Sequence, residues 1–313
     1  MKVPCIKSTA TVFLAVLLTG CATTNGTTTE GTADDGNSLR VVTTTTILGD
    51  IAATIAGDDF VVEVLMPAGA DPHDFQPSSQ QVASINDADL VITNGLGLEE
   101  GLLDVIEGAE ADGVKVLVVG TLVDPLPFAE AGPEELQTDP HFWTDPLRVA
   151  TAVEVISNTL SEIDPSVDWA TRASAYADEL AALDSEIEAL FGPISEASRK
   201  LVTNHDALGY FAHRYGFQIV GVVIPGGSTL AQPSSADLAA LVAVMEKEDV
   251  RVIFAETIAP AVLADAVAAE MGGEVEVVEL YTDSLGPEGS GAETLIDMLR
   301  LNAERIAAAL TRN

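Results

Sequence analysis

Three of the four histidines in this chain lie in loops whose composition would hold an imidazole rigidly. His73 stands in the run D-P-H-D-F-Q-P (71–77), between two prolines that stiffen the backbone on both sides. His141 follows Asp-Pro, and His205 lies in T-N-H-D. Asp283, in L-Y-T-D-S, adds a carboxylate. Three imidazoles and one carboxylate would form a closed shell for a divalent transition metal.

Short apolar runs alternate with helical patterns in both halves of the chain. We predict strands over 39–43, 60–66, 90–93, 115–119, 200–203, 218–224, 250–255 and 275–280. We predict the intervening helices over 47–56, 80–88, 98–110, 208–215, 235–248 and 262–271, with a final helix over 292–310. Strands that are apolar on both faces and alternate with helices indicate parallel sheets covered on both sides.

The two halves also share short sequences in the same order. Q-P-S-S occurs at 76–79 and again at 232–235, while V-T and L-G pairs recur at one offset. We therefore predict two Rossmann-like α/β lobes with parallel sheets, related by duplication.

A strong helical pattern lies between the halves. Asp164 and Pro165 suit the N-cap and first position of a long helix that would end at Phe191, before Gly192-Pro193. A shorter helix with Asp145 as its N-cap precedes it. We expect an N-terminal lobe over 39–145, a helical connection over 146–192 and a C-terminal lobe over 193–313. One rigid helix between the lobes would limit their hinge motion.

The candidate ligands lie where such a fold binds small molecules. In open α/β sheets, ligands bind beyond the carboxyl ends of the strands. His73 and Asp283 follow predicted strands in different lobes, and so we expect the four ligands to meet in the cleft between the lobes. Any one of these histidines taken alone would be read as an ordinary loop residue; their consistent placement favours a site.

Other residues near these motifs receive lesser roles. His213 lies inside a predicted helix, and we assign it to the surface or to packing. Glu256 ends a predicted strand and could face the cleft, where we expect it to support a ligand rather than bind the metal. Phe142 and Trp143 are expected to pack around the site.

The N-terminus has the pattern of a bacterial lipoprotein. Lys2 and Lys7 precede a short apolar run, and L-T-G-C (18–21) then reads as a lipobox. We predict a signal peptide over 1–20, a lipid on Cys21 and a flexible tether over 21–38. Processing would remove Cys5, which leaves no pair of cysteines for a disulfide.

The chain is strongly acidic. Its 49 acidic and 14 basic side chains give a formal net charge of −35, which argues against nucleic-acid binding. Such a surface attracts cations in general, but salt screens that attraction and it gives no selectivity.

The motifs together resemble a known family. The lipobox, D-P-H-D-F-Q-P-S, D-P-H-F-W-T-D-P, T-N-H-D-A-L-G-Y-F and L-Y-T-D-S-L-G are similar to those of the ZnuA/TroA-like metal-binding receptors of ABC importers, over nearly the whole mature chain. The resemblance places the ligands on His73, His141, His205 and Asp283. It implies two lobes joined by a rigid helix, and a monomeric, extracytoplasmic receptor that is lipid-anchored to the bacterial membrane and delivers metal to an ABC permease and its ATPase.

The resemblance also bears on the metal. Members dedicated to manganese typically carry Glu at the third ligand position, where this chain has His205, so we predict zinc, with manganese as the alternative. Many zinc receptors carry a histidine-rich acidic loop before the second histidine. Residues 128–138 are short and acidic and contain no histidine.

Two other functions compete with this interpretation. A zinc hydrolase would need an open coordination position for water and a base beside it, and no H-E-x-x-H pair occurs in the chain. A surface adhesin with a structural metal would leave metal uptake unchanged when it is deleted. We expect the protein to be a transport receptor and not an enzyme.

Overall fold

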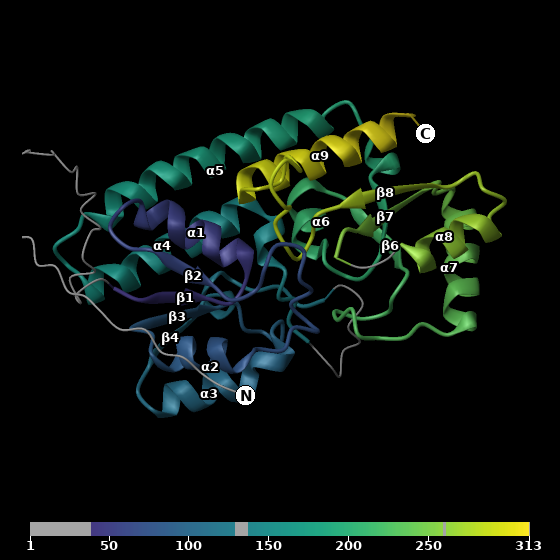
Figure 1. Cartoon of the computed structure of the whole chain (residues 1–313). Coiled ribbons are helices and arrows are strands. Elements are labelled where there is room, and N and C mark those ends of the chain that lie inside the picture. The colour runs from purple at the N-terminus through teal and green to yellow at the C-terminus, as the bar shows by residue number, and fades with distance from the viewer. Residues whose placement is uncertain (1–38, 129–136, 259–260, 313) are drawn as a thin grey trace, which may run out of the picture. The chain divides into compact units, whose positions relative to one another are not determined.

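The computed structural model describes residues 39–128, 137–258 and 261–312 (Figure 1). The predicted signal peptide, the tether and Cys21 lie outside the described residues. Among the residues that are described, no helix combines the length and the apolar character needed to cross a membrane.

The first sheet consists of four parallel strands. These are β1 (Val41–Thr43), β2 (Val62–Val64), β3 (Leu90–Thr93) and β4 (Lys115–Val118), in the order β2-β1-β3-β4. The helices α1 (Thr46–Ala56), α2 (Ser79–Asn86) and α3 (Leu103–Ala111) connect them. Figure 1 shows α2 and α3 on one side of this sheet and α1 on the other.

Alternating side chains of the central strands explain the two covered faces. Leu90 and Ile92 of β3 pack in the same core as α1, whereas Val91, between them, packs with the buried residues of α2 and α3. A strand points successive side chains to opposite faces, and so a run of apolar residues buries both.

The second sheet has the same topology. Its parallel strands are β5 (Lys200–Thr203), β6 (Gln218–Val222), β7 (Val252–Glu256) and β8 (Glu276–Leu280), in the order β6-β5-β7-β8. The helices are α6 (Gly209–Tyr215), α7 (Ser235–Glu248), α8 (Val262–Glu270) and α9 (Leu295–Arg312). Two α/β lobes with parallel sheets are therefore present, as predicted.

The repeated Q-P-S-S sequence has the same structural role in both lobes. Ser78 caps α2 and Ser234 caps α7, each with a capping box that a side chain at the third helical position completes. In each lobe this helix follows the second strand. The shared sequence therefore marks equivalent helices, in keeping with the predicted duplication.

The edge strands differ from the prediction that all strands are apolar on both faces. Glu63 and Val64 of β2 are exposed, as are Glu276 and Glu279 of β8. Each of these strands lies at the edge of its sheet, where one side has no neighbouring strand. Charged side chains on such an edge discourage pairing with another chain.

Two long helices connect the lobes, and one boundary was wrong. Helix α4 runs over Pro146–Ile163 from its N-cap Asp145, as expected, but α5 spans Trp169–Phe191 and begins four residues later than predicted. Asp164 accepts hydrogen bonds from the backbone N–H and the hydroxyl of Ser166, at 2.9 and 2.6 Å. It therefore forms a turn of its own, and Asp168 caps α5. The domain boundaries at 145/146 and 192/193 stay predictions.

Helix α5 contacts both lobes along its length of about 35 Å. Near its start, the Tyr176 hydroxyl donates to the Asp50 carboxylate of α1 at 3.4 Å. Further along, Asp184 accepts from Arg214 and from the Tyr215 hydroxyl of α6, at 2.8 and 3.0 Å. One apolar core runs without a break from the first sheet through α4 and α5 to the second sheet and α9. Both lobes therefore pack against the same helical core.

Candidate metal centre

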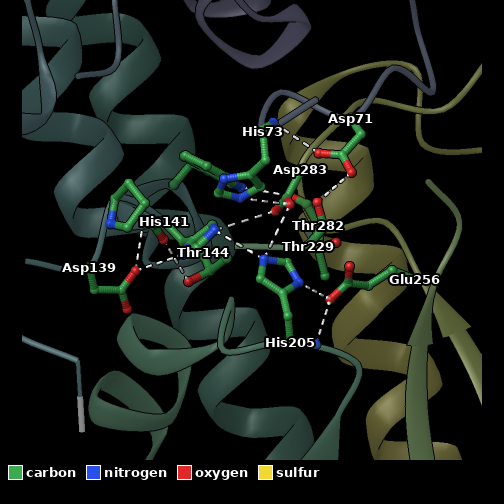
Figure 2. Close-up of polar contacts among 12 residues, drawn as sticks. Asp71, His73, Asp139, His141, Thr144, His205, Thr229, Glu256, Thr282 and Asp283 are labelled. Atoms are coloured by element: carbon green, nitrogen blue, oxygen red, sulfur yellow. Dashed lines mark hydrogen bonds and ion pairs between the residues drawn. The ribbon is translucent and has the colours of Figure 1, made fainter. Parts of the chain in front are cut away.

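The four predicted ligands meet in one buried cluster. Each of His73, His141, His205 and Asp283 offers a ligand atom, and these atoms all lie within 4.8 Å of one another. His73 and His141 come from the first lobe and its end; His205 follows β5 and Asp283 follows β8 in the second. Figure 2 shows the three imidazoles and the carboxylate turned toward a common centre.

The two Asp-Pro-His sequences form the same local turn. The backbone N–H of His73 donates to Asp71 Oδ1 at 2.9 Å, and that of His141 donates to Asp139 Oδ1 at the same distance. An aspartate that accepts from the backbone two residues ahead closes an Asx turn, and the proline between them stiffens it. Both histidines of the first lobe are therefore presented on pre-formed loops.

Two imidazoles are oriented by buried carboxylates. His141 Nδ1 lies 2.7 Å from Asp139 Oδ1, and His205 Nδ1 lies 2.5 Å from Glu256 Oε1. A proton on each Nδ1 would be donated to the carboxylate, which leaves Nε2 to face the centre of the cluster. The two Nε2 atoms are 3.2 Å apart. Glu256 thus contacts one of the predicted ligands, and its supporting role stays a prediction.

The cluster contains buried polar atoms without partners. Both ring nitrogens of His73 and both carboxylate oxygens of Asp283 are buried and have no hydrogen-bond partner among the described residues. Leaving a buried polar atom unpaired costs about 1–3 kcal/mol, and more if it is charged. A divalent cation at the centre would give a partner to one ring nitrogen of His73 and to the carboxylate of Asp283, so the donor set fits a metal.

Burial and mutual repulsion set the pKa values in the cluster. Burial, together with the neighbouring histidines, lowers the pKa of His73 to about 2 and that of His141 well below its ordinary value. Burial also opposes charge on His205, but the carboxylates of Glu256 and Asp283 outweigh it and raise its pKa to about 10. Burial raises the pKa of Asp283 to about 8.

Two of the imidazoles contact each other through their Nε2 atoms. A proton on His205 Nε2 can be donated to the free Nε2 of His141, which makes the 3.2 Å contact a hydrogen bond. The carboxylate of Asp283 is also close to this proton, because its Oδ2 lies 3.4 Å from His205 Nε2. A metal ion bound to both imidazoles would take the place of this proton.

Contacts across the two lobes hold the loop of Asp283. The indole N–H of Trp143 donates to the Thr282 carbonyl at 2.7 Å, and the backbone N–H of Leu285 donates to the Thr46 hydroxyl at 2.9 Å. The backbone N–H of Gly69, near His73, donates to the Ser284 hydroxyl at 2.8 Å. Trp143 therefore packs beside the site and also anchors it.

One histidine lies outside the cluster, and two buried carboxylates near the cluster were not identified from the sequence. His213 is exposed on α6, in agreement with the surface role assigned to it. Asp139 was not singled out, although the repeated Asp-Pro-His sequence was the signal for it. Glu99 was also missed: it is buried and accepts hydrogen bonds from Thr44 and Thr93 that join the ends of β1 and β3.

Residues 41–309 match the family described as ZnuA, zinc-uptake complex component A, periplasmic. The chain belongs to this family. It is 33% identical to the manganese-binding lipoprotein MntA of Halalkalibacterium halodurans over the full length of both chains. It is 30% identical to the iron-binding protein YfeA of Yersinia pestis, over 95% of this chain and 94% of that one.

A solved structure agrees in fold. The periplasmic zinc-binding protein TroA of Treponema pallidum superposes with a TM-score of 0.78 at 30% identity, covering 87% of this chain and 99% of that one. The expected two-lobed architecture is thus confirmed. The chain is a metal-binding receptor of an ABC importer.

Proposed function

We propose that the receptor captures Zn²⁺ with His73, His141, His205 and Asp283 and delivers it to a membrane permease driven by an ATPase. One observation carries the proposal: three imidazoles and a carboxylate form a buried set in which the ring nitrogens of His73 and the carboxylate oxygens of Asp283 have no hydrogen-bond partner among the described residues. Four such ligands suit the tetrahedral coordination of zinc.

Ligand chemistry supports zinc over manganese. Imidazole nitrogen suits zinc, whereas manganese prefers carboxylate, carbonyl and water oxygens, and the Irving–Williams order places zinc above manganese. The names of the relatives do not choose between the metals, because they include manganese-, iron- and zinc-binding proteins. The preference for zinc therefore rests on the donor set of this chain.

The receptor works outside the cytoplasm on a lipid anchor. The lipobox before Cys21 supports this location, and several relatives are named as lipoproteins. We propose that the receptor acts as a monomer, since each chain carries a complete ligand set.

The competing functions have less support. A zinc hydrolase needs a coordination position open to water, and four protein ligands would fill a tetrahedral shell. An adhesin with a structural metal would need no release of that metal. Deleting the protein and measuring zinc uptake by the cells separates the receptor from the adhesin, because only loss of the receptor lowers uptake.

The experiment that tests the proposal is a competition titration between zinc and manganese. We expect one zinc per chain, bound more tightly than manganese at neutral pH, and a sharp loss of affinity in His205→Ala. His213→Ala is the matched control, because it removes an exposed imidazole outside the cluster. Equal or reversed affinities would make the protein a manganese receptor, and a His205→Ala variant that binds like the control would contradict the proposed ligand set.

A further inference from the structure

The three imidazoles of the site are not supported equally. His141 and His205 each have a carboxylate within 2.7 Å of Nδ1, whereas His73 Nδ1 has no hydrogen-bond partner among the described residues. An imidazole that binds a metal through one nitrogen normally donates the proton of the other, and this outer bond fixes the orientation of the ring. His73 therefore needs an acceptor that the other two already have.

Glu100 is the carboxylate that faces this nitrogen. Its Oε1 lies 3.9 Å from His73 Nδ1, which is too long for a hydrogen bond but close enough to form one by a small movement. The His73 side chain is only 1% exposed, while that of Glu100 is 46% exposed. Glu100 thus stands between a buried ligand and the surface.

The backbone around Glu100 is held firmly against the loop of His73. The neighbouring Glu99 is buried and accepts hydrogen bonds from the backbone N–H groups of Asn94 and Gly95, at 2.7 and 3.0 Å. On the other side, a Cβ on Gly101 would stand 2.3 Å from the Phe75 carbonyl oxygen. Only glycine allows this approach, so the Glu100 turn packs directly on the segment that carries His73.

The opposite lobe holds both carboxylates near His73. The Ser228 hydroxyl donates to Glu100 Oε1 at 2.8 Å, and the Thr229 hydroxyl donates to Asp71 Oδ2 at 2.5 Å. Asp71 in turn accepts from the backbone N–H of His73 through its other oxygen. Glu100 and Ser228 also line a cavity of about 630 Å³ that opens beside the site.

We propose that Glu100 is the positioning residue of His73: it accepts the Nδ1–H when Nε2 binds a metal, and Ser228 holds it in place from the second lobe. His73 is then the ligand whose orientation depends on an exposed group at the junction of the lobes. Glu100 therefore sets how long the metal stays bound. This inference rests on the proposed function, because it concerns the same cluster.

The test measures zinc dissociation after mixing the loaded protein with an excess of a strong chelator. We expect Glu100→Ala to release zinc about 10–100-fold faster than the parent, the usual effect of removing an outer partner of a ligand. Asp104→Ala is the matched control, because it removes an exposed carboxylate from the next turn. Both variants lose one negative charge, so both should slow zinc association equally, and only Glu100→Ala should speed release.

A conservative variant separates hydrogen bonding from charge. The amide oxygen of Glu100→Gln can still accept the Nδ1 proton, and so we expect it to restore most of the residence time. The visible absorption of the cobalt-loaded protein, which reports coordination geometry, should change in Glu100→Ala and return in Glu100→Gln. Release from Glu100→Ala at the rate of the control, or no recovery in Glu100→Gln, would overturn the proposal.

Ser228→Ala tests the contribution of the second lobe. Because Ser228 acts through Glu100, the double variant should release zinc no faster than Glu100→Ala alone; additive effects would contradict this chain of contacts. Failure of the parent to bind zinc would contradict the proposed function. A parent that binds zinc while Glu100→Ala behaves as the control contradicts only the role of Glu100.

Discussion

At the scale of single residues, the three imidazoles of the cluster differ in their pKa values. The carboxylates of Glu256 and Asp283 overcome burial and raise the pKa of His205 to about 10, while burial lowers the pKa values of His73 and His141. At neutral pH the site therefore holds its proton on His205, and the other two imidazoles are already neutral. The ordinary histidine pKa of about 6.5 does not describe any of the three.

We expect zinc binding at pH 7 to release at least one proton. His205 contributes it, since the neighbouring carboxylates of Glu256 and Asp283 raise its pKa above this pH. Affinity should therefore rise with pH through the neutral range. Calorimetric titrations in buffers of different ionisation enthalpy measure the released protons directly.

Glu256→Ala is the control for this assignment. Without that carboxylate the pKa of His205 falls, and so proton release at pH 8 should decrease even though zinc binds more weakly. Release of no proton by the parent at pH 7 would contradict the state assigned to His205.

The predicted ligands could be recognised from the sequence, but some of the residues that contact them could not. His73, His141 and His205 stand in short motifs, and the Asp-Pro-His turn is a local structure that three consecutive residues determine. Glu100 and Ser228 are 128 positions apart and belong to different lobes, so their contact depends on how the lobes meet. No local pattern carries that information.

At the scale of elements, the two long helices explain why the site is pre-formed. Helices α4 and α5 pack against each other, and their buried faces belong to one continuous core that includes residues of both sheets (Figure 1). The lobes therefore share apolar packing, and their relative motion is limited. The late start of α5 shows the limit of cap patterns: both Asp164 and Asp168 suit an N-cap, and a turn closed by Ser166 decides between them.

We expect Leu180→Ala, in the middle of α5, to destabilise the metal-free protein by about 2–5 kcal/mol, because the side chain is fully buried and its loss leaves a cavity. Leu190→Ala on the same helix is the matched control, since Leu190 is 37% exposed and should change the free energy of unfolding by about 0.5 kcal/mol or less. Urea denaturation measures both. Equal losses of stability in the two variants would mean that the buried face of α5 does not hold the lobes together.

At the scale of the whole molecule, the charge of −35 opposes compact folding. Raising the salt concentration from 0.1 to 1 M shortens the screening length from about 10 to about 3 Å and weakens this repulsion. We therefore expect the melting temperature of the metal-free protein to rise over that range. A melting temperature that stayed constant or fell would show that surface repulsion contributes little to stability.

The two-lobed architecture could be predicted because the sequence repeats its strand–helix order and its Q-P-S-S cap. The order of the strands was not predicted, because parallel strands with helical connections leave several arrangements open. What could not be predicted is the set of contacts between the lobes, such as that of Trp143 with Thr282. Each of these contacts joins two residues that lie far apart in the chain and in different elements.

In the proposed site, one metal ion is bound by residues of both lobes at once. A crystal structure of the zinc-loaded protein, with anomalous scattering measured at the zinc edge, tests it most directly. We predict one peak bound to His73, His141, His205 and Asp283, at about 2.0–2.2 Å from three nitrogens and one oxygen. A peak held by ligands of one lobe alone, or one lying outside this cluster, would contradict the account.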